Sequence, residues 1–218
     1  MKDNSKLAND VLEELAWDAR LDARHVDAGA LDGIVTLRGS VASYAEKWAA
    51  ERAAERVDGV KAVANELSVV VPAELAQADA DLAAAVVNAL AWDVRVPDTR
   101  IKSSVTDGWV TLEGEVEWSY QREAAAKAVR NLVGVQGVSN NIAIVPKTLV
   151  PHDVRESIKA ALERRADDTV DHIRVEAKGS VVTLRGSVPS FAEREAAERA
   201  AWSAPGVTEV HDDLAVMI

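Results

Sequence analysis

The sequence predicts an α+β protein built from three tandem α-β-β-α-β repeats, each a small three-stranded sheet with two helices packed on one face. A heptapeptide, VTLRGSV, occurs twice with identical letters and once more as VTLEGEV. A Gly-Val pair follows the glycine of each heptapeptide by 20 residues. Inside each copy the apolar period changes from 3.6 to 2, as it does where a helix gives way to strands. The repeat-defining structural glycines are Gly39, Gly114, Gly186, Gly59, Gly134 and Gly206.

These markers divide the 218 residues into three domains, residues 1–72, 73–147 and 148–218. Short polar segments near Pro72 and Pro146 separate the copies. A repeat of this length is a complete supersecondary unit, so the chain is interpreted as a triplication.

The first element of each copy is a predicted helix. In the first copy Val11 and Leu15 lie at helical spacing, and in the third copy Val154, Ile158 and Leu162 do so. Apolar residues three or four positions apart line one face of a helix, which would cover the sheet.

Two strands joined by a tight turn are expected next. Asp32-Gly33 and Asp107-Gly108 lie between alternating apolar runs, which is a strong signal for a two-residue hairpin. The third copy has Lys178-Gly179-Ser180 at this place, so its turn is expected to differ. The heptapeptide glycine lies on the inward-facing side of the second strand. Glycine there predicts a close approach, most simply by a packed helix.

A second, alanine-rich helix and a last strand complete each copy. Ser43 with Glu46, and Ser190 with Glu193, have the spacing of capping boxes that open this helix. The middle copy has Trp118-Ser119-Tyr120-Gln121 instead. The Gly-Val pair is expected to end the helix before the last strand.

Composition narrows the function classes. The chain is 48% apolar and carries no cysteine, which provides for a core and excludes disulfides, thiol nucleophiles and cysteine-based zinc sites. Its net charge of −11 disfavours nucleic acid as a partner and opposes electrostatic adsorption to anionic lipid. There is no apolar run long enough for a transmembrane helix. The acidic N-terminal segment predicts a cytoplasmic protein, or a periplasmic one only if a leader has been removed.

The combined pattern resembles the BON domain family, named for bacterial osmotic-stress and nodulation proteins. The motifs that carry the resemblance are DGIVTLRGSV with GVKAVANELSV, DGWVTLEGEV with GVQGVSNNIAI, and SVVTLRGSV with GVTEVHDDLAV. They cover about residues 6–71, 80–146 and 152–217. The third copy departs by lacking Asp-Gly and by having Asp212 where Asn65 and Asn140 stand.

The resemblance implies a non-enzymatic protein associated with osmotic and envelope stress. Family members bind phospholipid surfaces or misfolded envelope proteins, and one cytoplasmic relative binds potassium. Three function hypotheses therefore stay open: association with membrane phospholipid or partner proteins, a potassium-responsive protein, and a holdase-type chaperone for unfolded clients. The oligomeric state is not predicted.

The sequence predicts no catalytic, metal-binding or cofactor-binding residue. It predicts no cofactor either, except that a bound potassium ion stays open. The sequence contains no Gly-rich phosphate loop or nucleophile motif. An acidic strand face, Glu113, Glu115 and Glu117, is either a solvated surface or a cation-attracting patch. The histidines neither repeat in register nor show metal-ligand spacing; they are His25, His152, His172 and His211.

Tryptophans supply the candidate interaction surface. Trp48 and Trp202 align with charged residues in the other copies, so both positions are predicted to face solvent in the common fold. They either pack between neighbouring repeats or contact lipid or a partner. Trp109 precedes Val110 in a predicted strand, so the two side chains point to opposite faces of the sheet. Trp109 is therefore predicted on the uncovered face. The aligned residues are Glu123 and Glu195 for Trp48, and Glu55 and Arg130 for Trp202.

Trp17 and Trp92 are equivalent to each other. Both are expected just after the first helix of their copy, and the third copy has Arg164 at this position.

Overall fold

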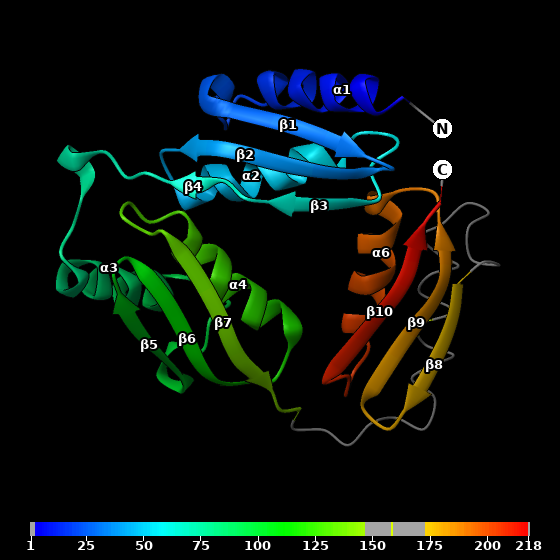
Figure 1. The fold of residues 1–218 in the computed structure, drawn as a ribbon. Helices are drawn as coiled ribbons and strands as arrows, with labels where there is room; N and C mark the ends of the chain where they lie inside the picture. The colour runs from blue at the N-terminus through cyan, green and yellow to red at the C-terminus, as the bar shows by residue number, and fades with distance from the viewer. Residues whose placement is uncertain (1–2, 147–157, 159–172, 218) are drawn as a thin grey trace. The chain divides into compact units, whose positions relative to one another are not determined.

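A computed structural model describes residues 3–146, 158 and 173–217 of the chain (Figure 1). By its contacts the chain forms two compact units. The first comprises residues 1–114 and 123–141, which is the first copy and most of the second. The other comprises residues 115–122 and 142–218, which includes the third copy.

The first copy has the predicted order of elements, with its last strand in two pieces. Leu7, Val11 and Leu15 of its first helix are buried, at the spacing of one helix face. The elements are α1 (Asn4–Trp17), η1 (Ala23–His25), β1 (Val26–Leu31), β2 (Ile34–Val41), α2 (Tyr44–Glu55), β3 (Ala62–Asn65) and β4 (Ser68–Val69).

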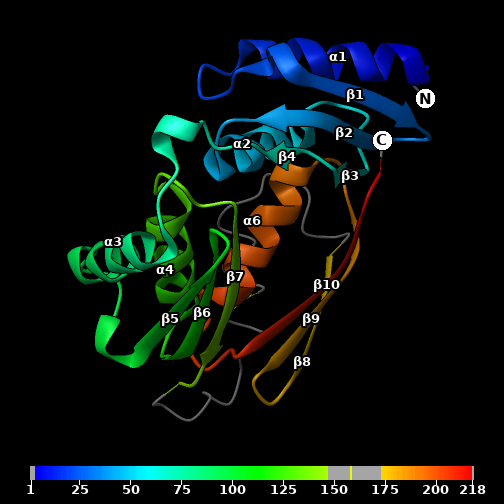
Figure 2. The same ribbon diagram turned by 60° about the vertical axis from the view of Figure 1, so that its left-hand side comes forward.

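The second copy repeats this order with an unbroken last strand. Figure 2 shows β5, β6 and β7 side by side after a 60° turn of the view in Figure 1. The elements are η2 (Ala73–Leu75), α3 (Asp79–Trp92), η3 (Asp98–Arg100), β5 (Ile101–Thr106), β6 (Trp109–Val116), α4 (Ser119–Arg130) and β7 (Gly137–Ile144).

The third copy is described from its hairpin onward. Ile158 is fully buried in its core with Val182 and Leu184, whereas the predicted helix positions Val154 and Leu162 lie outside the described residues. The elements are β8 (Ile173–Lys178), β9 (Val181–Val188), α6 (Phe191–Trp202) and β10 (Glu209–Val216).

The sheet topology confirms the α-β-β-α-β repeat. The first two strands of each copy pair antiparallel, as β1 does with β2. The last strand then lies on the other side of the middle strand, and it runs parallel in the first and third copies. A parallel return requires a crossover, which α2 and α6 provide.

In the first copy, both helices cover one face of the sheet. On β2, Val35 and Leu37 are buried while Ile34 is 51% exposed, so only one face of the strand is covered. α2 joins α1 on that side, because Arg56 at the end of α2 forms an ion pair of 2.8 Å with Glu14 of α1.

The heptapeptide needs glycine because a backbone carbonyl group, and not a packed helix, lies close to this position. Gly39 has φ +113°, and a Cβ added there would lie 2.0 Å from the carbonyl oxygen of His25. Gly114 repeats this geometry, 2.1 Å from the carbonyl oxygen of Arg100. The prediction of a packed helix at this point was therefore wrong. The close contact comes from the residue that precedes the paired strand.

The turn of the third copy differs as expected. Asp32-Gly33 and Asp107-Gly108 have positive φ at both residues, the pattern of a type I′ turn. In the third copy Gly179 has φ +61°, and Ser180 does not have a positive φ. This is the pattern of a type II′ turn, which needs glycine only at its first central position.

The predicted helix caps are present. The Ser43 hydroxyl accepts a hydrogen bond from the Glu46 backbone N–H, and Ser190 does the same for Glu193. In the middle copy the Gln121 side chain accepts from two backbone N–H groups before the helix. The Gly-Val pairs lie in the turn after each helix, with the helix ending four residues before the glycine. Their buried valines are Val60, Val135 and Val207.

The departure at Asp212 preserves a contact between strand and helix. In the first copy the Asn65 amide donates to the Lys47 carbonyl oxygen at 3.0 Å. In the third copy Asp212 accepts from Arg194 at 2.7 Å. Arg194 is equivalent to Lys47, so both copies have a hydrogen bond between the same strand and helix positions. In the first copy the strand residue donates, and in the third copy it accepts.

Candidate interaction surface

Two equivalent tryptophans are almost fully exposed at the ends of α1 and α3. Trp17 is 88% exposed and Trp92 is 89% exposed. Each lies two residues after a buried leucine of its helix, Leu15 or Leu90. Two residues turn a helix by about 200°, so the ring points away from the face that covers the sheet.

A rigid Asp-x-Arg turn follows each exposed ring. The Asp18 carboxylate accepts from the backbone N–H of Arg20 at 3.1 Å and from its Nε at 2.9 Å. Asp93 and Arg95 repeat these contacts at 3.0 and 2.9 Å. The two copies therefore present Trp17 and Trp92 in the same way, each followed by an exposed guanidinium.

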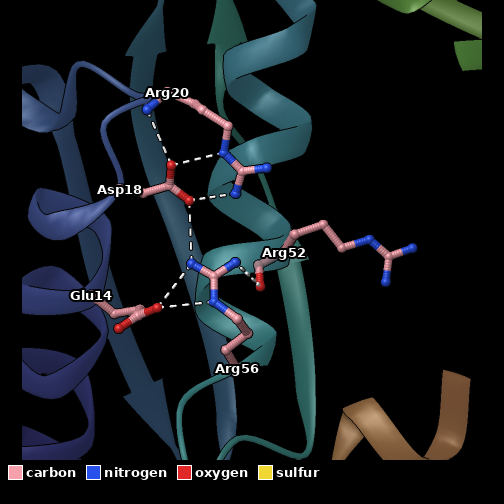
Figure 3. Close-up of polar contacts among 5 residues, drawn as sticks. All are labelled: Glu14, Asp18, Arg20, Arg52 and Arg56. Atoms are coloured by element: carbon pink, nitrogen blue, oxygen red, sulfur yellow. Dashed lines mark hydrogen bonds and ion pairs between the residues drawn. The ribbon is translucent and has the colours of Figure 1, made fainter. Parts of the chain in front are cut away.

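In the first copy this turn is tied to the second helix (Figure 3). Arg56 donates to Glu14 at 2.9 Å and to Asp18 at 3.2 Å. Hydrogen bonds from Arg20, and then from Arg56, hold the pKa of the Asp18 carboxyl well below its usual range. The carboxylate thus stays ionised and fixes the chain that leaves α1.

The second copy has the same Asp-x-Arg turn but not the contacts that Arg56 makes with Glu14 and Asp18. Ala89 and Asn131 occupy the positions of Glu14 and Arg56. The side-chain and backbone hydrogen bonds from Arg95 lower the pKa of Asp93 to about 2. The Asp-x-Arg turn therefore forms without the arginine that binds Asp18 in the first copy.

Trp109 lies on the uncovered sheet face, at 50% exposure. Its Nε1 donates to the Ser139 hydroxyl at 2.9 Å. Its ring covers Gly137 on the neighbouring strand, where an added Cβ would lie 2.3 Å from the ring. Trp109 is thus packed flat on the sheet, with one side of the ring in solvent.

Trp48 is half-buried within the first unit. The Arg130 guanidinium carbon lies 3.9 Å from the ring centroid, and that of Arg52 lies 5.0 Å from it. Both are within the range of cation–π attraction. Burial lowers the pKa of Arg130 from its usual value.

Trp202 is half-buried within the second unit. The Arg122 guanidinium carbon lies 4.8 Å from its ring centroid. Its Nε1 donates to Glu198 at 3.3 Å. Trp48 and Trp202 thus lie against arginines and are less accessible than Trp17 and Trp92.

The helical phase of Trp17 and Trp92 was the signal that would have identified them as the exposed pair. The comparison of charged aligned positions singled out Trp48 and Trp202 instead. A charged residue at the aligned position of another copy indicates that the position faces solvent. It does not reveal that Arg130 covers the ring of Trp48, or that Arg122 covers the ring of Trp202.

The acidic strand face was interpreted as either a solvated surface or a cation-attracting patch. Glu113 and Glu115 are exposed on β6. Within residues 3–146, 158 and 173–217, no three His, Asp or Glu side chains gather as a metal ion would require. In the same part of the chain, no helix has the length and apolarity needed to cross a membrane.

Comparison with known proteins gives a family match over nearly the whole chain. The BON domain matches residues 3–71, 78–146 and 152–217. Osmotically-inducible protein Y of Escherichia coli (strain K12) is 33% identical over 145 residues, which is 62% of this chain and 71% of that protein.

Two solved structures of CdsD, a structural protein of the Type III secretion system of Chlamydia trachomatis, also match. The C-terminal domain aligns over 100% of both chains with 13% identity and a TM-score of 0.27. The second structure aligns over 97% of this chain and 92% of that chain, with 11% identity and the same TM-score. Such low TM-scores carry no argument about this protein.

Proposed function

Since the chain belongs to the BON domain family, with three tandem copies, we propose that it is a non-enzymatic osmotic-stress protein that binds phospholipid membrane surfaces. Its similarity to an osmotically inducible protein supports the stress role. Trp17 and Trp92 are the anchors in this proposal.

The observation that carries the proposal is the exposure of these two rings. A tryptophan that is nearly 90% exposed keeps a large apolar surface in water. An indole ring is suited to the boundary between headgroups and acyl chains, because its body is apolar and its N–H is polar. Burying both rings there would remove this surface from water.

The charge of the chain shapes the expected lipid preference. A net charge of −11 opposes adsorption to anionic vesicles. Arg20 and Arg95 place an exposed guanidinium three residues after each ring, where it can meet a lipid phosphate. We therefore expect binding that depends on the rings, with only a modest preference between anionic and neutral vesicles.

Liposome co-sedimentation in physiological KCl tests the proposal, with tryptophan emission followed in the same samples. The wild-type chain should bind with a blue shift. The Trp17→Glu/Trp92→Glu double variant should lose binding while keeping its circular dichroism spectrum. The Trp17→Phe/Trp92→Phe variant is the matched control and should retain binding, because it keeps an apolar ring at both positions.

Two results would contradict the proposal. If the wild-type chain fails to sediment with either vesicle, lipid is not its ligand. The open hypotheses are then a protein partner, unfolded client proteins or potassium. If the glutamate double variant binds as the wild type does, membrane binding uses another surface.

A further inference from the structure

Trp48 and Trp202, which the proposed lipid function does not use, each lie against an arginine of another copy. Trp48 belongs to α2 of the first copy, and the Arg130 guanidinium over its ring belongs to α4 of the second copy. Trp202 belongs to α6 of the third copy, and the Arg122 guanidinium over its ring also belongs to α4. Each contact therefore links the second helices of two consecutive copies, and α4 supplies the arginine in both.

The two contacts use nearly the same pair of positions, with the residue types exchanged. Arg130 and Trp202 are equivalent residues of their copies. Arg122 is equivalent to Lys47, the residue before Trp48. In the first contact the earlier copy supplies the tryptophan, and in the second contact it supplies the arginine. An accidental surface contact would not recur at equivalent positions with its two chemical partners exchanged.

Arg130 is held against one face of α2. Its guanidinium carbon lies 3.9 Å from the centroid of the Trp48 ring. Burial is the main cause that lowers the pKa of Arg130, and Arg52 lowers it further, whereas Tyr44 and Glu51 act in the opposite direction. Tyr44, Trp48 and Glu51 are half-buried and occur at helical spacing in α2. The guanidinium has therefore lost part of its water and lies against an aromatic ring, which attracts a cation.

We infer that the contact between Arg130 and Trp48 is the joint that fixes the first two copies to each other, and that the joint forms with the arginine and the tryptophan in either order. Arginine suits this role because its flat guanidinium stacks on an indole ring and is less strongly hydrated than an ammonium group. The contact between Arg122 and Trp202 has the reverse order. The joint links the copies that carry Trp17 and Trp92, so it keeps the arrangement of these two rings constant.

Distances between spin labels on the first two copies test the joint. The chain has no cysteine, so Leu31→Cys/Thr106→Cys places one label at equivalent exposed positions of the two copies. Electron paramagnetic resonance of the labelled full chain should give one narrow distance distribution. Arg130→Ala should broaden this distribution by at least about twofold, because the guanidinium that ties α4 to α2 is removed.

Arg52→Ala is the matched control. It removes a guanidinium whose carbon lies 5.0 Å from the centroid of the same ring, but Arg52 and Trp48 belong to one helix. The distribution should therefore stay narrow. If Arg130→Ala does not fold, Arg130→Gln gives the same test, because glutamine is a good helix former without a charge. Circular dichroism checks the folding of every variant.

An exchange of the two residues tests the second part of the inference. Trp48→Arg alone should broaden the distribution, because it places two guanidinium groups together. Trp48→Arg/Arg130→Trp should restore the narrow distribution, since it recreates the order of the contact between Arg122 and Trp202.

Four results would overturn the inference. The first is a broad distribution for the wild-type chain, which would mean that the two copies move independently. The second is a narrow distribution for the Arg130 variants. The third is an equal broadening by Arg52→Ala and Arg130→Ala. The fourth is an exchange variant as broad as Trp48→Arg. None of these readouts involves a vesicle, so the joint is tested independently of the proposed lipid function.

Discussion

Replacing Gly39 with alanine tests the structural role given to the heptapeptide glycine. Gly39 has φ +113°, a conformation that residues with a Cβ rarely adopt. The added Cβ would lie 2.0 Å from the carbonyl oxygen of His25, where real contacts are not shorter than 3.0 Å. The β1–β2 pair would therefore have to separate at the Val26–Gly39 end of its register.

The expected loss in free energy of unfolding is about 2–5 kcal/mol. The backbone conformation alone costs an L-residue about 1–3 kcal/mol. Moving the strand end by about 1 Å weakens one or two hydrogen bonds, each with a net value of about 1 kcal/mol. A domain has only about 5–15 kcal/mol of stability in total, so the first copy would be close to unfolding.

Urea unfolding and hydrogen exchange of the β1 and β2 amides would measure this loss. Gly29→Ala, in the same sheet, is the matched control. No atom lies within 4 Å of its added Cβ and its φ is not positive, so its effect should be below about 1 kcal/mol. Gly179→Ala, with φ +61° in open space, should fall between the two. A Gly39→Ala variant no less stable than Gly29→Ala would refute the reasoning.

Two further predictions concern pH and ions. Asp18→Asn should cost about 1 kcal/mol near neutral pH, because it removes the negative charge and one of the two oxygens that accept hydrogen bonds from Arg20 and Arg56. The folded pKa of Asp18 is lowered, so this stability is complete above the unfolded pKa of about 4 and is lost as pH falls through the folded value. Melting temperatures from pH 2 to 7 should therefore converge for wild type and variant in acid, and an unchanged gap would contradict this. Melting temperatures in KCl and NaCl of equal ionic strength should agree if lipid is the ligand, whereas a higher value in KCl would favour the potassium hypothesis.

The fold was predictable because each local signal occurs in at least two of the three copies. Period, turn residues and caps at Ser43 and Ser190 recur at fixed spacing, and each agrees with the observed element. The contact at Gly39 was not predictable in the same way. A strand glycine signals a close approach, but only the register between β1 and β2 reveals that the approaching atom is the His25 carbonyl oxygen.

The candidate surface was predictable only in part, because exposure depends on neighbours that are distant in sequence. Trp48 aligns with charged residues, yet Arg130 from another helix covers its ring. No local pattern at Trp48 encodes that contact. Trp17 and Trp92 are different, since the phase of their own helices directs the rings outward, and this information was present in the sequence.

The first and second copies share one exposed feature at equivalent positions. Trp17 and Trp92 have the same geometry in two copies, which is the expected arrangement for anchors that meet one extended surface. When one ring binds, the other binds from a high local concentration, so two weak anchors hold more strongly than either alone.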